Sequence, residues 1–157
     1  MKSNIEKEIL ENGSILYEVK GSSMWPLIRQ NKDLCVIVKT PKNLNKYDVV
    51  LYKRDDQIIL HRIIAIENGE YVIAGDNCYQ KEYGIKKNNI IGILKSVERN
   101  SKNKRNLRSL KINSPKQKLY AHIWCDFFPV RYAILKSRHL AGQTKLGMWL
   151  KNKKAAE

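Results

Sequence analysis

Cysteine is scarce in this chain, and so are the spacings that would give it a structural role. Cys35, Cys78 and Cys125 lie far apart, are odd in number and form no Cys-x-x-Cys pair. Neither a disulfide framework nor a zinc site is therefore indicated. We expect a reducing compartment and no metal or other cofactor.

Long apolar runs are also missing. The first residues, MKSNIEKEILENG, are polar and lack the apolar core of a signal peptide. No stretch approaches the roughly 18 or more apolar residues that span a bilayer. The nearest candidate, LYAHIWCDFFPVRYAIL, is broken by His122, Asp126, Pro129 and Arg131. We therefore expect a cytoplasmic protein, or one peripheral to a membrane, with no transmembrane segment or signal peptide.

Acidic residues are nearly absent from the last third of the chain. Only Asp126 and Glu157 fall within residues 99–157, which hold half of the 30 Lys and Arg. The net charge of +15 therefore lies almost entirely in the tail, and residues 1–98 are close to neutral.

The composition, 43% hydrophobic and 29% charged, fits a folded protein. The length of 157 residues allows one domain and an extension.

Short runs rich in Val, Ile and Tyr dominate the first two thirds. They are separated by turn residues, including an Asn-Gly hairpin tip, and so predict strands. A short helix is expected over residues 4–11, closed by Gly13. The expected strands are residues 14–20, 34–40, 48–54, 57–66, 70–75 and 90–97. This pattern favours a mainly β protein, a compact antiparallel barrel or sandwich.

The character of the sequence changes after residue 98. Residues 99–118 have many cations and few large apolar groups, which is typical of a linker or a solvated basic arm. Residues 119–157 regain apolar side chains and predict a basic, amphipathic and mostly helical extension, interrupted at Pro129. We therefore divide the chain into a β domain (1–98), a basic linker (99–118) and a C-terminal extension (119–157).

The stretch GSSMWPLI, residues 21–28, places two serines in an expected loop. A serine hydroxyl becomes a good nucleophile only when a neighbouring base accepts its proton. His61 is the best candidate, because it shares one face of an apolar strand with Ile59 and Ile63. Burial there disfavours the charged imidazole and keeps the ring available as a base. The alternative is a core histidine that is hydrogen-bonded to the backbone.

A carboxylate follows in IAGDNCY, where Asp76 lies in a Gly-Asp-Asn turn after a strand. This sequence suits an ordinary turn. It also suits a carboxylate that holds an imidazole in the correct tautomer, as in a serine–histidine–aspartate triad. Both interpretations stay open from the residues alone.

Taken in order, GSSMWPLI, YDVVLYK, LHRIIAI, AGDN and IIGIL resemble the motifs of the type I signal peptidase family and its LexA-like relatives, over residues 17–97. The resemblance implies that family's β fold, with Ser23 as the nucleophile. It implies His61 as the base. Bacterial members use lysine at this position, whereas the archaeal and endoplasmic-reticulum branch uses histidine. Asp76 matches an aspartate of that branch. A further aspartate usually follows, and here Glu82 is the only acid in that segment.

The resemblance also implies how the oxyanion is bound. Many bacterial members place a serine two residues before the nucleophile, and here Gly21 occupies that position. The Ser23 backbone N–H, with help from Ser22, is then the main donor. Losing one such donor costs about 10²–10³ in turnover, which predicts a slower enzyme. The expected oxyanion and substrate-binding residues are Gly21, Ser22, Met24 and Pro26.

The function that this resemblance implies is a serine endopeptidase that cleaves a signal or leader peptide after small residues, without the N-terminal membrane anchor of signal peptidases. A histidine base predicts activity that rises through about pH 6.5. One alternative is a LexA-like regulator that cleaves itself, although residues 1–20 hold no Ala-Gly or Cys-Gly bond and Ala141-Gly142 lies in the tail. The other is a catalytically inactive peptide-binding module.

A peptide or preprotein is the expected partner. The extension combines cations with Trp124, Phe127, Phe128, Tyr132 and Trp149, a composition that suits an anionic membrane surface. It suits equally a helical cap on the barrel. Because the basic arm has no recognisable nucleic-acid-binding motif, we disfavour nucleic acid as a partner.

Overall fold

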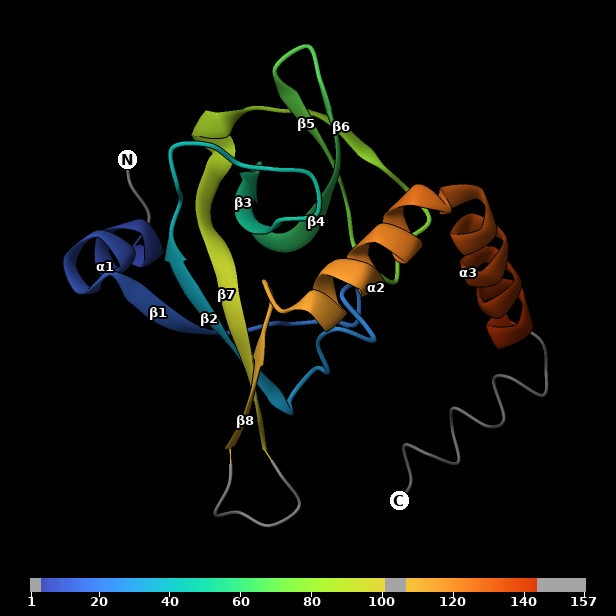
Figure 1. The fold of residues 1–157 in the computed structure, drawn as a ribbon, viewed down its shortest axis with the longest axis horizontal. Helices are drawn as coiled ribbons and strands as arrows, with labels where there is room; N and C mark the ends of the chain where they lie inside the picture. Colours follow the sequence, from blue (N-terminus) through green and yellow to red (C-terminus); the bar gives the residue numbers. More distant parts are fainter. Residues whose placement is uncertain (1–3, 101–106, 144–157) are drawn as a thin grey trace.

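The computed structural model describes residues 4–100 and 107–143, and it shows a mainly β fold with helices at both ends (Figure 1). The elements are α1 (Asn4–Asn12), β1 (Ser14–Glu18), β2 (Asp33–Lys39), β3 (Val49–Arg54), β4 (Gln57–Glu67), β5 (Glu70–Ala74), β6 (Glu82–Ile85), the short 3₁₀ helix η1 (Lys87–Asn89), β7 (Ile90–Asn100), β8 (Leu107–Lys111), α2 (Pro115–Asp126) and α3 (Phe128–Gln143).

The strands form one antiparallel sheet in the order β1-β2-β7-β3-β4-β5-β6, with β8 paired to β7 outside this path. Register shifts interrupt the β2–β7, β3–β7 and β4–β5 pairings, and such bulges bend a sheet. The curl of β3 and β4 is visible in Figure 1. The prediction of a mainly β antiparallel fold, with a short N-terminal helix and C-terminal helices, is confirmed.

The central strands are buried on both faces, which explains their continuous apolar sequence. In β3, Val49 and Leu51 belong to one buried cluster, whereas Val50 and Tyr52 belong to a second. The first cluster lies among α1, β1, β2 and β7, and it also takes in residues of the serine-bearing loop. That loop is therefore part of the core and is held by it.

In the segment expected to be a basic linker, residues 99–118, the described residues (99–100 and 107–118) lie mostly in regular elements. It contains the end of β7, the whole of β8 and the start of α2. Leu110 pairs with Val97 across the two strands and packs on the first cluster, which gives this basic stretch an apolar anchor. The three-part domain division itself stays a prediction.

Helices α2 and α3 pack on the β domain. Cys125 joins a buried cluster with Ile64, Val72 and Ala74 of β4 and β5. Asp126 accepts hydrogen bonds from Lys46 at 2.6 Å and from the Tyr47 hydroxyl at 2.9 Å. The helix breaks between Asp126 and Phe128, beside Pro129, as the sequence predicts. The expectations for Trp149 and the rest of residues 144–157 lie outside the described residues.

Candidate active site

The serine-bearing loop, residues 21–28, is anchored by its own apolar side chains. Met24, Leu27 and Ile28 are buried in the first core cluster, and the Ile28 N–H donates to the Met24 carbonyl at 2.9 Å. Ser23 is half-buried and Ser22 is exposed. Because these flanking apolar residues are buried, they fix the position of Ser23 at the edge of the core.

The buried carboxylate of Asp33 fixes the C-terminal end of this loop. Asp33 accepts hydrogen bonds from the Arg29 backbone at 2.9 Å and from Arg29 Nη2 at 2.7 Å, and Arg99 Nε lies 3.3 Å away. Burial raises the pKa of Asp33, but the hydrogen bonds from Arg29 outweigh it, so the pKa lies below its usual value. Arg99 also donates to the Leu27 carbonyl. The serine is therefore presented on a fixed loop.

His61 lies on β4 and is only 7% exposed. Its Nδ1 faces Glu82 Oε1 at 3.2 Å and the Tyr52 hydroxyl at 3.3 Å. Burial lowers the pKa of His61, and the nearby Glu82 carboxylate opposes this only in part. The imidazole is therefore neutral at neutral pH. A proton on Nδ1, pointing at Glu82, leaves the Nε2 lone pair free to act as a base.

Gly75 allows the histidine and the serine loop to approach each other. A Cβ atom at Gly75 would stand 2.9 Å from His61 Nε2 and 2.7 Å from the Ser23 carbonyl oxygen, closer than side-chain carbons are tolerated. Glycine is therefore required where the two segments meet, and Gly75 lies beside both His61 Nε2 and the serine loop.

Ser23 and His61 line the same cavity, of about 610 Å³. The other lining residues are Lys20, Arg54, Ile59, Cys78, Gln80, Lys81 and Glu82. Within the described residues, no hydrogen bond joins the Ser23 hydroxyl to the His61 ring. Such bonds are often long in the absence of substrate and tighten when it binds. The cavity thus places a hydroxyl and a neutral base on one surface.

Asp76 does not contact the imidazole as the sequence led us to expect. It is fully buried, and its two carboxylate oxygens accept bonds from Arg62 Nε at 2.8 Å and Nη2 at 2.7 Å. The Tyr120 hydroxyl adds a third bond at 3.3 Å. The reason lies in strand geometry: His61 and Arg62 are neighbours and point to opposite faces of β4. Asp76 meets the arginine face.

The carboxylate that meets the histidine face is Glu82, the first residue of β6. It contacts His61 through Oε1 and forms an ion pair with Arg54 through Oε2 at 2.9 Å. The sequence offered one signal for it, since Glu82 is the only acid in the segment after the Gly-Asp-Asn turn. Tyr52, Asn77 and Cys78, which also lie at the site, carried no such signal.

The expected oxyanion and substrate-binding residues are dispersed. Among the described residues, none accepts a hydrogen bond from the Ser23 N–H. Gly21 and Ser22 are exposed beside it. Met24 is buried, and its sulfur accepts the Asp76 N–H at 3.5 Å. Pro26 lines a separate cavity of about 130 Å³. Substrate contacts by these residues stay predictions.

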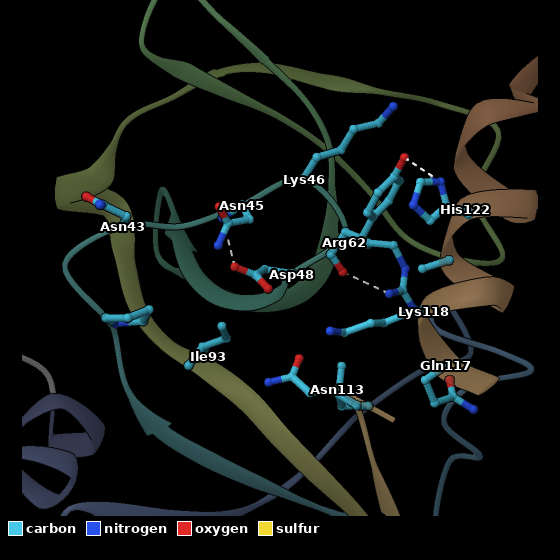
Figure 2. Close-up of a pocket in the computed structure, with 14 residues that line it drawn as sticks. Asn43, Asn45, Lys46, Asp48, Arg62, Ile93, Asn113, Gln117, Lys118 and His122 are labelled. Atoms are coloured by element: carbon cyan, nitrogen blue, oxygen red, sulfur yellow. Dashed lines mark hydrogen bonds between the residues drawn. The ribbon is translucent and has the colours of Figure 1, made fainter. Parts of the chain in front are cut away.

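A different cavity, of about 530 Å³, lies between residues 41–48 and α2 (Figure 2). Figure 2 shows Arg62 reaching the backbone of this segment, where it donates to the Tyr47 carbonyl at 2.9 Å. The Tyr47 hydroxyl lies 3.0 Å from His122 Nδ1 on α2. Neither Ser23 nor His61 lines this cavity, so it is separate from the candidate catalytic cavity. Its lining residues come from both the β domain and α2.

Residues 4–100 and 107–143 hold neither a metal-ligand cluster nor a membrane-spanning helix. No cluster of three or more His, Cys, Asp or Glu in this part of the chain is placed to hold a metal ion. No helix there combines the length and apolar character that a membrane crossing requires.

A fixed serine, a buried neutral histidine and a carboxylate around one cavity are the parts from which serine hydrolase sites are built. Residues 2–98 match the family described as Peptidase S24-like. The match covers more than half of the chain, and the chain belongs to this family, which indicates a serine peptidase of the signal-peptidase or LexA type. A separate comparison with curated proteins found no match.

Proposed function

We propose that this protein is a serine endopeptidase of the signal-peptidase type that cleaves a signal or leader peptide after small residues. Ser23 is the nucleophile, His61 the general base and Glu82 the carboxylate that orients the base. The observation that carries this proposal is the shared cavity of Ser23 and the buried His61, whose Nδ1 faces Glu82. A histidine base is typical of the archaeal and endoplasmic-reticulum branch, and this supports our proposal that the protein belongs to that branch.

The proposed reaction begins when Ser23 Oγ bonds to the carbonyl carbon of the substrate and its proton passes to His61 Nε2. The negative charge then develops on the carbonyl oxygen, within reach of the Ser23 N–H. Breakage of the C–N bond follows, and the leaving amine takes the proton from Nε2. A water molecule repeats these steps on the acyl-enzyme and releases Ser23. Glu82 stabilises the imidazolium that forms in each half-reaction.

Two adjoining cavities support an extended peptide as the substrate. The catalytic cavity and a second one, of about 350 Å³, share Lys20, Ser23 and Ile59. The second cavity continues past Tyr17 and Val19, at the end of the edge strand β1. An edge strand offers unpaired backbone groups to an added strand. A peptide that lies across Ser23 would occupy both cavities.

We also propose peripheral contact between the C-terminal extension and an anionic membrane. Leu119 and Ile123 are exposed four residues apart on one face of α2, and Phe127 is exposed directly after the helix. Val130 and Ile134 are exposed on α3, where Lys136 and Arg138 add cations. Apolar side chains with nearby cations suit an anionic interface, where each cation contributes about 1 kcal/mol.

Sedimentation with vesicles tests the membrane contact. We expect the protein to bind phosphatidylserine-containing vesicles more than neutral ones, and less at high salt. The double variant I123S/F127S should bind less than the wild type. Equal binding to both vesicle types, or none to either, would count against the contact.

A cleavage assay tests the proposed peptidase. In a library of leader-like peptides we expect cleavage after small residues by the wild type, none by Ser23→Ala, and normal cleavage by the matched control Ser14→Ala, an exposed serine on β1. Circular dichroism should show all three folded. Full activity of Ser23→Ala would reject the mechanism.

Two further measurements, of the intact mass and of peptide binding, separate the alternative functions. Loss of full-length mass during incubation of the wild type alone would favour self-processing, and the helical setting of the Ala141-Gly142 bond in α3 gives no support for that outcome. Peptide binding without cleavage would favour an inactive binding module.

A further inference from the structure

The C-terminal helices contact the loop that joins the two halves of the candidate site. Arg131 of α3 is 1% exposed, and its Nη2 donates to the Gly75 carbonyl and, at 2.9 Å, to the Cys78 carbonyl. Its guanidinium lies 5.7 Å from the centre of the Trp124 ring. Trp124 Nε1 of α2 donates to the Asp76 carbonyl at 2.8 Å. Three carbonyls of one four-residue turn are thus held from the helical side.

The amide N–H groups of the same turn hold the serine loop. The Asn77 N–H donates to the Ser23 carbonyl at 2.6 Å, and Asn77 Nδ2 donates to the Ser22 carbonyl at 3.2 Å. The Asp76 N–H meets the Met24 sulfur at 3.5 Å. Because a peptide group is planar, fixing its carbonyl also fixes the direction of its N–H. The helices therefore determine where this turn presents its donors to the serine loop.

Two ring contacts extend this support along α3. Tyr132 packs edge-on against Tyr79, just after the turn, with ring centres 5.7 Å apart. The Arg138 guanidinium lies 4.6 Å from the centre of the Trp25 ring, two residues after Ser23. One helix thus touches both loops that meet at the cavity.

We propose that Arg131 and Trp124 are positioning residues for the reaction of Ser23, and that α2 and α3 form part of the active-site framework. Both helices lie outside residues 2–98, the range that matches the family. This inference rests on the proposed peptidase function. Neither residue touches substrate in this account: they act through the turn at residues 75–78, where Gly75 lies beside both His61 Nε2 and the Ser23 carbonyl.

The test uses the full chain and a fluorophosphonate, a probe that reacts with activated serines. Arg131→Gln removes the contacts to two carbonyls, and we expect Ser23 labelling to slow by between about 10- and 100-fold, because small misplacements of reacting groups have effects of that size. Arg131→Lys should give an intermediate rate. The control Arg108→Gln, an exposed arginine on β8, should react as the wild type does.

Two readouts distinguish positioning from a change of base or a loss of fold. The pH at which labelling rises should stay unchanged in Arg131→Gln, because His61 and Glu82 are intact. Alkylation of Cys78 by iodoacetamide should become faster, because this half-buried thiol lies on the released turn. The rates are compared at a pH where the thiol is ionised in both proteins, because Arg131 also lowers the pKa of Cys78. If Arg131→Gln does not fold, Trp124→Phe removes one hydrogen bond and keeps an aromatic ring, and the same changes are expected in smaller size.

The outcomes separate the two proposals. Wild-type rates of labelling and alkylation in folded Arg131→Gln and Trp124→Phe would overturn the positioning role. Absence of Ser23 labelling in the wild type would overturn the proposed peptidase function instead, and the alkylation of Cys78 would still report whether the helices hold the turn.

Discussion

At the scale of single residues, two neighbours on β4 have different partners. His61 faces Glu82 and the cavity, whereas Arg62 faces Asp76 beneath α2. Each basic side chain therefore meets its own carboxylate. This separation predicts that neutralising the two acids has different effects. Neutralising Glu82 should reduce the rate of catalysis, whereas neutralising Asp76 should reduce the free energy of unfolding.

Glu82→Gln tests the catalytic carboxylate. We expect the rate of peptide cleavage to fall by about 10²–10⁴-fold, since the imidazolium loses its counter-charge and His61 its orientation. The rate rises as His61 loses its proton, and burial already lowers the pKa of His61, so the wild-type rise should lie below about pH 6.5. Removing the Glu82 charge lowers that pKa further. The rise in kcat/KM with pH should therefore move to still lower pH, and an unchanged profile would contradict the assignment.

Asp76→Asn tests the structural carboxylate. The variant leaves the buried Arg62 guanidinium without its charged partner, and breaking such a pair costs about 3–5 kcal/mol of unfolding free energy. Urea denaturation measures the loss. The control Asp56→Asn, an exposed acid in the β3–β4 turn, should be nearly neutral. A stable Asp76→Asn variant that has lost only its activity would return Asp76 to a catalytic role.

The sequence predicted the position of the histidine better than its partner. Apolar alternation around His61 predicted a buried ring, and the ring is buried. Alternation also puts Arg62 on the opposite face, but it cannot say which acid each face meets. That choice depends on the path of residues 75–82, which turn under α2 before they reach β6, and this path is set by long-range packing.

At the scale of elements, the turn at residues 75–78 is where the segments of the site meet. Gly75→Ala would place a methyl group within 3 Å of a backbone oxygen and of two side-chain atoms, so the turn must shift. We expect cleavage to fall by about 10²-fold or more and stability by about 1–3 kcal/mol. Gly69→Ala, in the open β4–β5 hairpin, should reduce stability alone, because its φ of +79° disfavours alanine. Equal effects of both variants on activity would contradict this account.

The two strands that the sequence missed are β6 and β8. Within the part of the chain that the structure describes, β6 pairs with β5 alone and has no fully buried residue, so its sequence shows no apolar run. β8 lies in a basic stretch and is recognisable only through its pairing with β7. Strands at the margins of a sheet take their stability from a partner, and a periodicity argument finds only strands that are buried themselves.

At the scale of the whole molecule, the helices and the β domain share buried contacts. Cys125 lies in a cluster with β4 and β5 residues, and burial raises the pKa of its thiol to about 11. We therefore expect one cooperative unfolding transition. Tryptophan fluorescence and far-ultraviolet circular dichroism should report the same urea midpoint. An early loss of helical signal would show that the C-terminal helices unfold as a separate unit.

The most direct test of the central claim is to locate the covalent adduct that a fluorophosphonate forms. Peptide mapping by mass spectrometry should find the adduct on Ser23 in the wild type, and the adduct should be lost in a folded His61→Ala variant. An adduct on another residue, or equal labelling of Ser23 without His61, would contradict the account.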